Sequence, residues 1–115
     1  MRALDNAHAP YSNFRVGAAL LTRDGRLITG CNVENSAYGL AICAETLAVA
    51  SAVSQGLTEF EEIAIASEDS EPTPPCGACR QVISEHLDAS ATVRVDGVGD
   101  FKPGDLLPHA FALLP

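Results

Sequence analysis

Three of the four cysteines stand at positions from which a folded chain can bring their sulfurs together. Cys76 and Cys79 form a Cys-x-x-Cys pair, and 32 residues, positions 44 to 75, separate that pair from Cys43. Thiolates are common zinc ligands, and three protein ligands leave the fourth tetrahedral position to water, which is typical of a catalytic zinc site. Considered alone, the pair is also typical of a redox dithiol or of half a structural zinc site.

A carboxylate accompanies the first of these cysteines. Glu45 follows Cys43 by two residues, which gives the tripeptide Cys-Ala-Glu. In zinc deaminases a glutamate at this spacing carries protons without binding the metal, while Pro-Cys-x-x-Cys supplies the remaining ligands. That signature usually begins with His, whereas this chain has Cys. The combined spacing predicts a zinc-dependent deaminase site in which the three cysteines hold Zn²⁺ and Glu45 moves protons.

The fourth cysteine and the start of the chain help to decide whether the cysteines bind metal or form disulfides. Cys31 lies in a stretch with strand character, where a small buried thiol is the ordinary role, so we expect it in the core. The stretch MRALDNAHAP lacks the apolar region of a signal peptide, which predicts a cytoplasmic protein. In a reducing compartment, metal binding or catalysis is a better expectation for cysteines than disulfides.

The charge of the chain argues against two kinds of partner. Fifteen acidic and seven basic residues give a net charge of −8. Nucleic-acid binding rests on Lys and Arg that release counterions, so we expect no nucleic-acid partner, and the lack of an 18-residue apolar run predicts no membrane partner. We interpret the acidic runs at 59–62 and 68–71 as solvated surface, and Arg80 as a helix or subunit-contact residue.

The elements that must position these residues indicate one α/β domain. The 115 residues, 47% of them apolar, suffice for a single core. The expected elements, in chain order, are strands at 15–23 and 26–33, a helix of about 12 residues from Cys43 to Gly56, a strand at 61–67, a helix at 76–87, and strands at 91–96 and about 100–102. Asp24-Gly25 is a hairpin signal between the first two strands.

Two further features of this order matter for the site. The last strand follows its predecessor too closely for a parallel crossover, so it should run antiparallel in a mixed sheet. The first helix is apolar on nearly every face, which predicts burial on both sides. Cys43 opens that helix, and Cys76 and Cys79 straddle the first turn of the second, so the positive ends of two helix dipoles should stabilise thiolates at one point.

Five motifs in order carry a resemblance to a known family: PYSNFRVGAAL, GCNVENSAYG, CAE, PCGACRQ and DLLPHAF. From about Pro10 to Phe111 the chain resembles the small cytidine deaminases, the homotetrameric class with three cysteine ligands. The resemblance implies one cytidine deaminase-like layered α/β/α domain over 1–115, a five-stranded mixed sheet flanked by helices. It implies zinc-dependent hydrolysis of cytidine or deoxycytidine to uridine or deoxyuridine plus ammonia, in a homotetramer with shared active sites.

The resemblance also implies residues that bind a small pyrimidine nucleoside. Asn32 and Glu34 of the NVEN motif would hold the ribose hydroxyls, with Glu34 on the 3′-hydroxyl. Phe14 would pack against the pyrimidine or the sugar, and Tyr38 would lie beside the 5′ side of the ribose.

Two more contacts follow from the resemblance. The backbone N–H of Ala44, at the start of a predicted helix, would hold the 2-carbonyl of the base. Phe111 matches an aromatic residue that reaches into the site of a neighbouring subunit.

The chain departs from the family pattern in two places. Thr46 stands where three-cysteine members commonly have an Arg that hydrogen-bonds the ligand sulfurs, and the N-terminus supplies only a stub of the usual first helix. Deaminases of guanidino-nucleoside antibiotics (blasticidin S-like) also lack that Arg and are the nearest rival activity. A structural zinc module and a nucleic-acid deaminase remain as alternatives, the latter requiring a basic groove.

Overall fold

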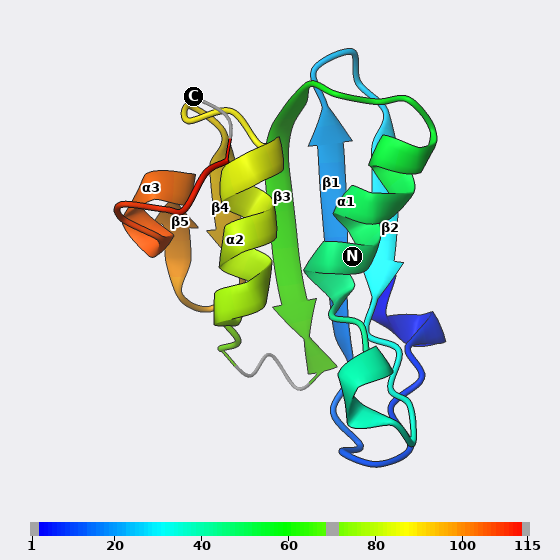
Figure 1. Ribbon diagram of the computed structural model, residues 1–115. Helices are drawn as coiled ribbons and strands as arrows, with labels where there is room; N and C mark the ends of the chain where they lie inside the picture. Colours follow the sequence, from blue (N-terminus) through cyan, green and yellow to red (C-terminus); the bar gives the residue numbers. More distant parts are fainter. Residues whose placement is uncertain (1–2, 69–71, 114–115) are drawn as a thin grey trace.

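Five strands form one mixed sheet at the centre of the computed structural model, which describes residues 3–68 and 72–113 (Figure 1). The strand order is β2-β1-β3-β4-β5. The strands are β1 (Val16–Thr22), β2 (Leu27–Cys31), β3 (Phe60–Ser67), β4 (Thr92–Val95) and β5 (Gly99–Phe101). The helices are α1 (Ala44–Ser54), α2 (Gly77–His86) and the short α3 (Pro103–Leu106), with 3₁₀ turns η1 (Ala3–Asn6) and η2 (Tyr38–Leu40).

The predicted topology is confirmed in its main points. β1 and β2 form an antiparallel hairpin, and Gly25 in its turn adopts a φ of 93°, which glycine accepts without strain. β3 and β4 are parallel, with α2 as the crossover, whereas β5 runs antiparallel to β4 as the short connection required. The sequence did not predict α3, η1 or η2.

Glycines let other elements approach both faces of the sheet. A Cβ on Gly30 would lie 2.4 Å from the carbonyl oxygen of Ala44, so glycine at this position allows α1 to lie directly on β2. A Cβ on Gly17 would lie 2.6 Å from the backbone nitrogen of Leu4 in η1. Since Gly17 pairs with Cys31 and not with Gly30, the two glycines face opposite sides of the sheet. The N-terminal stub is therefore a 3₁₀ turn on the face opposite α1.

The two longer helices, α1 and α2, lie side by side on one face of the sheet (Figure 1). The sheet-facing residues of α1 are buried, among them Ala48, Val49 and Ala52, but Ala50 and Val53 on its other side are exposed. The prediction that α1 is buried on both sides is therefore not met within the single chain. None of the helices in the described ranges is long and apolar enough to span a membrane.

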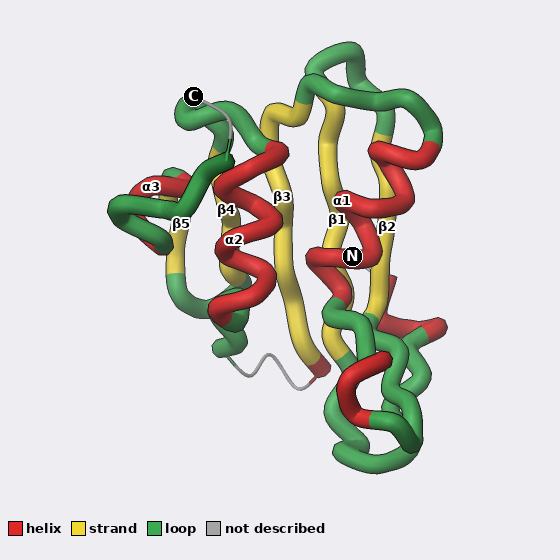
Figure 2. Tube along the Cα trace, viewed as in Figure 1, coloured by secondary structure: helices red, strands yellow, loops and turns green. Residues whose placement is uncertain are grey.

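Strand register brings three chain segments to one edge of the sheet. Val16 pairs with Ser67 and Gly17 pairs with Cys31, so the start of β1 lies beside the ends of β2 and β3. Figure 2 shows the loops that follow η1 and β2 gathered at this edge, where the backbone N–H of His8 donates to the carbonyl oxygen of Asn32. The segments that lead to α1 and α2 start from here.

Candidate metal centre and surrounding pocket

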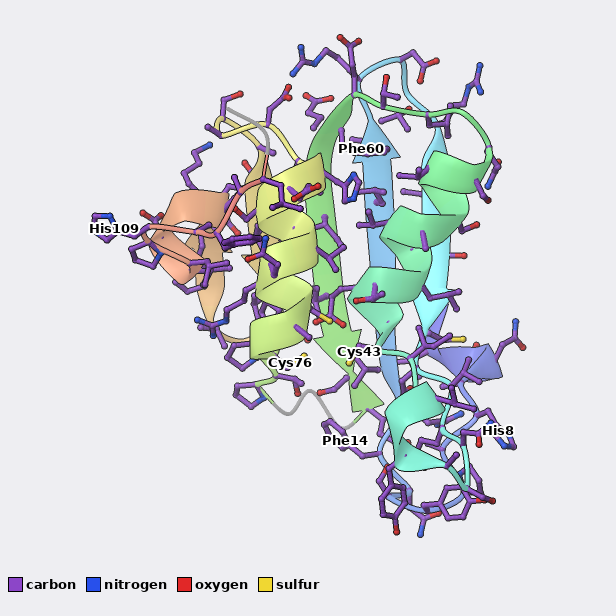
Figure 3. All side chains as sticks on the ribbon, viewed as in Figure 1. His8, Phe14, Cys43, Phe60, Cys76 and His109 are labelled. Atoms are coloured by element: carbon purple, nitrogen blue, oxygen red, sulfur yellow. The ribbon has the colours of Figure 1, made fainter. Side chains whose placement is uncertain are left out.

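The N-termini of α1 and α2 bring three sulfurs together. Cys43 precedes the first residue of α1, Cys76 precedes that of α2, and Cys79 lies in the first turn of α2. Their sulfurs all lie within 4.8 Å of one another, and Figure 3 shows Cys43 and Cys76 at the same end of the sheet. Cys31, at the end of β2, is not part of this group. It is half-buried and lies outside the core cluster, so the prediction that it is a core residue is not met.

The sulfur spacing fits zinc. Zn–S bonds of about 2.3 Å in a tetrahedron place the sulfurs about 3.8 Å apart. Cys43 Sγ and Cys76 Sγ lie 3.7 Å apart. Three sulfurs leave one tetrahedral position free of protein ligands, so the group fits a catalytic site better than a closed structural one.

Negative charge is crowded at this centre. Burial raises the pKa of the Cys79 thiol, and the nearby Glu45 carboxylate raises it further. Burial also raises the pKa of Cys43. Burial opposes ionisation of Cys76 as well, but its pKa is lowered overall, because the backbone N–H of Cys79 and the neighbouring thiols favour the thiolate. A divalent cation would offset the charge that three thiolates bring to one place.

Glu45 lies beside the sulfurs as the second residue of α1. It is only 5% exposed, and burial raises the pKa of its carboxyl group. Its charge contributes to the raised pKa of Cys79 and of Cys43. A carboxyl group whose pKa moves towards neutrality is suited to taking up and returning protons.

Two residues that follow the ligands contact their surroundings differently. Thr46 Oγ1 lies 3.3 Å from Cys79 Sγ and can donate a hydrogen bond to it. Arg80 donates instead to the carbonyl oxygens of Pro75, at 2.7 Å, and Leu106, at 3.1 Å. The interpretation of Arg80 as a helix-contact residue is confirmed, since it ties α2 to α3 and to the segment before Cys76.

Comparison with known proteins identifies the family. The model of the cytidine and deoxycytidylate deaminase zinc-binding region matches residues 1–94. The chain belongs to this deaminase family. The matched part includes all three clustered cysteines and Glu45.

Individual relatives agree with this assignment. A cytidine deaminase of Sporosarcina psychrophila is 45% identical over 96% of this chain and 85% of its own length. The crystal structure of cytidine deaminase from Mycobacterium tuberculosis superposes with a TM-score of 0.88, at 44% identity over 97% of this chain and 90% of that one. A blasticidin-S deaminase of Bacillus cereus is 32% identical over 81% of this chain and 69% of its own length. The predicted fold, a five-stranded mixed sheet flanked by helices, is thus confirmed by solved deaminase structures.

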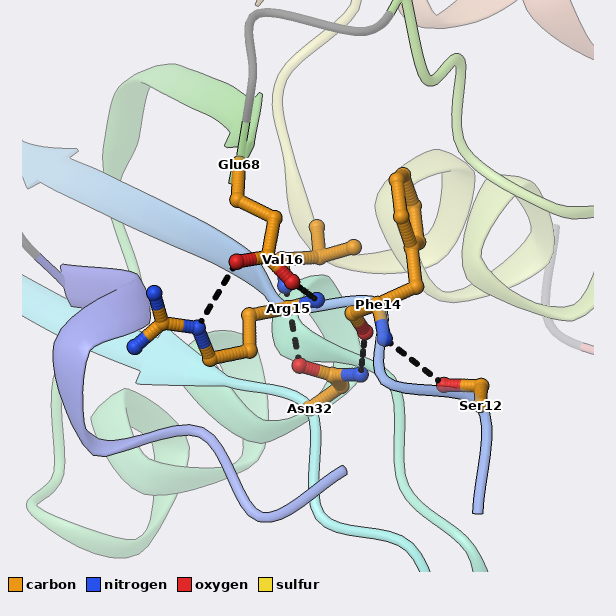
Figure 4. Close-up of polar contacts among 6 residues, drawn as sticks. All are labelled: Ser12, Phe14, Arg15, Val16, Asn32 and Glu68. Carbon is orange, nitrogen blue, oxygen red and sulfur yellow. Dashed lines mark hydrogen bonds and ion pairs between the residues drawn. The ribbon is translucent and has the colours of Figure 1, made fainter. Parts of the chain in front are cut away.

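Asn32 follows β2 and fixes the segment that carries Phe14. Its Oδ1 accepts a hydrogen bond from the Val16 N–H at 2.9 Å, and its Nδ2 donates to the Phe14 carbonyl oxygen at 2.8 Å (Figure 4). The Phe14 side chain is half-buried and packs against the edge of the core. In this deaminase Figure 3 labels Phe14 at the same end of the sheet as Cys43 and Cys76.

Glu34 and Tyr38 line a hollow of about 330 Å³ that opens on the loops at the same edge. The Glu34 carboxylate accepts hydrogen bonds from the backbone N–H of Tyr11 at 2.9 Å and from the Ser12 hydroxyl at 2.5 Å. The hydrogen bond from Ser12 is the main cause that lowers the pKa of Glu34, so this carboxylate is ionised at neutral pH. Tyr38, in η2, is 84% exposed.

The two remaining predicted contacts lie in different places. Ala44, the first residue of α1, is fully buried at the metal centre, and its N–H has no acceptor within the helix. Phe111 lies along α2, where its carbonyl oxygen accepts a hydrogen bond from Gln81 Nε2 at 3.0 Å, and its side chain is 68% exposed. Its role in the site of a neighbouring subunit stays a prediction.

Sequence reasoning missed two residues at the sheet edge. Ser12 bonds Glu34 and also accepts from the Phe14 N–H at 3.1 Å. Glu68 was interpreted as solvated surface, which is wrong, because its side chain is only 24% exposed and accepts hydrogen bonds from Arg15. The rest of that acidic run, 69–71, lies outside the described residues. Ser12 belongs to the quoted motif PYSNF, but no local pattern distinguishes Glu68.

Proposed function

We propose that the protein catalyses the hydrolytic deamination of cytidine and deoxycytidine to uridine and deoxyuridine, with release of ammonia, as in pyrimidine salvage. The observation that carries this proposal is a group of three cysteine sulfurs with zinc-like spacing beside the buried carboxyl group of Glu45. The named relatives over most of the chain support it further.

Each residue at the centre has a distinct task in this proposal. Cys43, Cys76 and Cys79 hold Zn²⁺, which supplies Lewis acidity and makes water a competent nucleophile near neutral pH. Glu45 takes the proton that this water gives up. Glu45 then delivers this proton to N3 of the pyrimidine, which makes C4 electrophilic, and the hydroxide adds to C4. The new hydroxyl group on C4 gives its proton to Glu45, which passes it to the amino group, and the C4–N bond breaks as ammonia leaves. The raised pKa of Glu45 suits both directions of transfer.

The surrounding residues orient the nucleoside. The free N–H of Ala44 donates to the 2-carbonyl of the base, and Phe14 forms an apolar wall against the ring. Asn32 uses one N–H and one lone pair for its own chain, which leaves one of each for a ribose hydroxyl. Glu34 keeps acceptor capacity on Oε2 for the 3′-hydroxyl, and Tyr38 closes the 5′ side of the hollow.

We also assign an assembly to this function, namely a homotetramer whose subunits share active sites. Apolar side chains that a single chain leaves exposed support it: Tyr38, Leu40, Ile42, Val53 and Phe111. In the assembly Phe111 completes the pocket of another subunit. Sedimentation tests this directly, since a fully active monomer would remove Phe111 from the site. We place the protein in the cytoplasm, where thiol ligands stay reduced.

A guanidino-nucleoside deaminase is the second candidate, favoured by Thr46 and by the similarity to a blasticidin-S deaminase. The deciding experiment measures zinc content together with ammonia release from cytidine, deoxycytidine, cytosine and blasticidin S. We expect zinc in the purified protein and turnover of the two pyrimidine nucleosides. Turnover of blasticidin S alone would establish the second candidate, and bound zinc without turnover of any substrate would indicate a structural zinc module.

A further inference from the structure

Glu68 holds Arg15 by its backbone as well as by its side chain. Glu68 Oε1 accepts the Arg15 N–H at 3.0 Å, and Glu68 Oε2 accepts Arg15 Nε at 3.1 Å (Figure 4). The Glu68 N–H donates to the Arg15 carbonyl oxygen at 3.0 Å. An exposed ion pair between side chains usually contributes little to stability. Two of these three bonds, however, end on the main chain, so the contact fixes the path of the backbone.

The residues on either side of Arg15 also have their backbone groups hydrogen-bonded. The carbonyl oxygen of Phe14 and the N–H of Val16 both bond the Asn32 amide, as described above, and the Val16 carbonyl oxygen accepts the Asn32 N–H at 3.2 Å. Together with the bond from the Phe14 N–H to Ser12, every backbone polar group from Phe14 to Val16 has a partner.

The segment needs this support because it is irregular. Asn13, directly before Phe14, has a φ of 57°, a left-handed conformation that only a few residue types accept readily. Phe14 lies outside β1, so no strand pairing holds its backbone. The position of its ring therefore depends on the hydrogen bonds that hold the backbone around it. Asn32 bonds the Phe14 carbonyl oxygen, and Glu68 bonds the next residue, Arg15.

We propose that Glu68 is a positioning residue for the substrate pocket, because it fixes Arg15 and thereby the place of the Phe14 ring. This inference rests on the proposed function, in which Phe14 contacts the nucleoside. If a pocket wall moves by about 1 Å, it loses contact with the ligand and is no longer pre-organised for binding. A residue that never touches the substrate can therefore change the affinity of the enzyme for that substrate.

The test compares three variants with cytidine as substrate. In Glu68→Ala all side-chain bonds to Arg15 are lost, and we expect KM to rise about 5- to 10-fold, with kcat and zinc content within about twofold of wild type. In Arg15→Met only the bond to Nε is lost, so KM should rise by about twofold or less. Glu62→Ala is the matched control, because Glu62 lies on β3, the strand that Glu68 follows, and its carboxylate bonds the side chain of Arg94, at 3.1 Å.

A double-mutant cycle separates positioning from general stabilisation. If Glu68 acts through Phe14, then Glu68→Ala should change KM by less than about twofold in a Phe14→Ala background. Glu68→Gln is the conservative variant, and its KM should stay near that of wild type, since its amide oxygen can still accept the Arg15 N–H. Should Glu68→Ala fold poorly, as judged by circular dichroism, Glu68→Leu, which keeps the side-chain volume but offers no acceptor, replaces it in the cycle.

Three results would overturn the inference. The first is a KM for Glu68→Ala equal to that of Glu62→Ala, and the second is an undiminished effect of Glu68→Ala in the Phe14→Ala background. The third is a Phe14→Ala enzyme with unchanged KM, which would remove Phe14 from the pocket while leaving deamination intact. Failure of the wild-type protein to deaminate cytidine would instead defeat the proposed function, and the variants are interpreted only against an active wild type.

Discussion

The metal centre and the sheet edge that holds Phe14 lie at the same end of the molecule, but their polar groups are satisfied in opposite ways. At the metal centre, burial raises the pKa of two cysteine thiols and of Glu45. At the sheet edge, hydrogen bonds from their own chain lower the pKa of Glu34 and of Glu68. At the metal centre, burial opposes ionisation of these groups. At the sheet edge, hydrogen-bond donors of the chain stabilise the ionised carboxylates.

This difference indicates which part of the site depends on a ligand. Three sulfurs and a carboxyl group crowded together need a cation to become ionised together. The carboxylates of Glu34 and Glu68 already have their donors, so the wall of the pocket is formed before any ligand arrives. Binding energy for a nucleoside is therefore not consumed in ordering that wall.

Metal removal should have the largest effect, and this effect should be confined to the metal centre. Dialysis against a zinc chelator should reduce deamination to background, since no other group in the proposed mechanism activates water, and added Zn²⁺ should restore it. Hydrogen exchange at the Arg15 and Val16 amides should stay protected in the metal-free protein, because their acceptors belong to the chain. Full activity without metal would contradict the dependence of the metal centre on zinc. Loss of protection at both amides would contradict the independence of the sheet edge from the metal.

Replacement of Glu45 should have the next largest effect. Glu45→Gln keeps the volume of the side chain but cannot carry protons, so kcat should fall by roughly three orders of magnitude, within the range of 10²–10⁴ typical for one transfer. Zinc content should be unchanged, because Glu45 is not a ligand. Glu61→Gln, an exposed glutamate on β3, serves as control. A Glu45→Gln enzyme of near wild-type rate would exclude the proposed proton shuttle.

The metal centre was predictable from the sequence because its information is local. Cys43 and Glu45 stand two positions apart at a helix start, Cys76 and Cys79 share one helical turn, and a helix N-terminus determines where such side chains lie. The antiparallel last strand followed from the length of its connection in the same way.

The sheet edge was not predictable from local patterns. The contact between Arg15 and Glu68 joins residues 53 positions apart, and no spacing rule links them. The bonds of Asn32 to Phe14 and Val16 likewise depend on where β1 and β2 end in space. α1 was apolar all round in sequence, and the close approach of its backbone to Gly30 follows from the path of β2, which no local pattern reveals.

Thr46 offers a smaller test at the metal centre. Its hydroxyl is 3.3 Å from the sulfur of the buried Cys79, and a donor to a thiolate offsets part of the crowded charge. Thr46→Val removes this donor at nearly constant volume, so the dissociation constant for Zn²⁺ should rise about tenfold, the lower end of what second-sphere contacts contribute. Competition with a chromophoric chelator measures this constant. Thr46→Ser should bind zinc like the wild type, and equal affinities for all three proteins would exclude the role of Thr46.

The smallest expected effect is a pH-dependent difference in melting temperature, caused by Glu68 at the sheet edge. The pKa of Glu68 in the folded protein lies below its ordinary value of 4.5, chiefly because the Arg15 N–H and side chain bond its carboxylate. Its stabilising contribution is therefore complete above that value and is lost as the pH falls through the folded pKa. The melting temperature of the wild type should exceed that of Glu68→Gln by a constant margin above pH 4.5 and converge with it below. Glu61→Gln should show no such convergence, and a margin that persists into strong acid would mean that the charge of Glu68 does not hold Arg15.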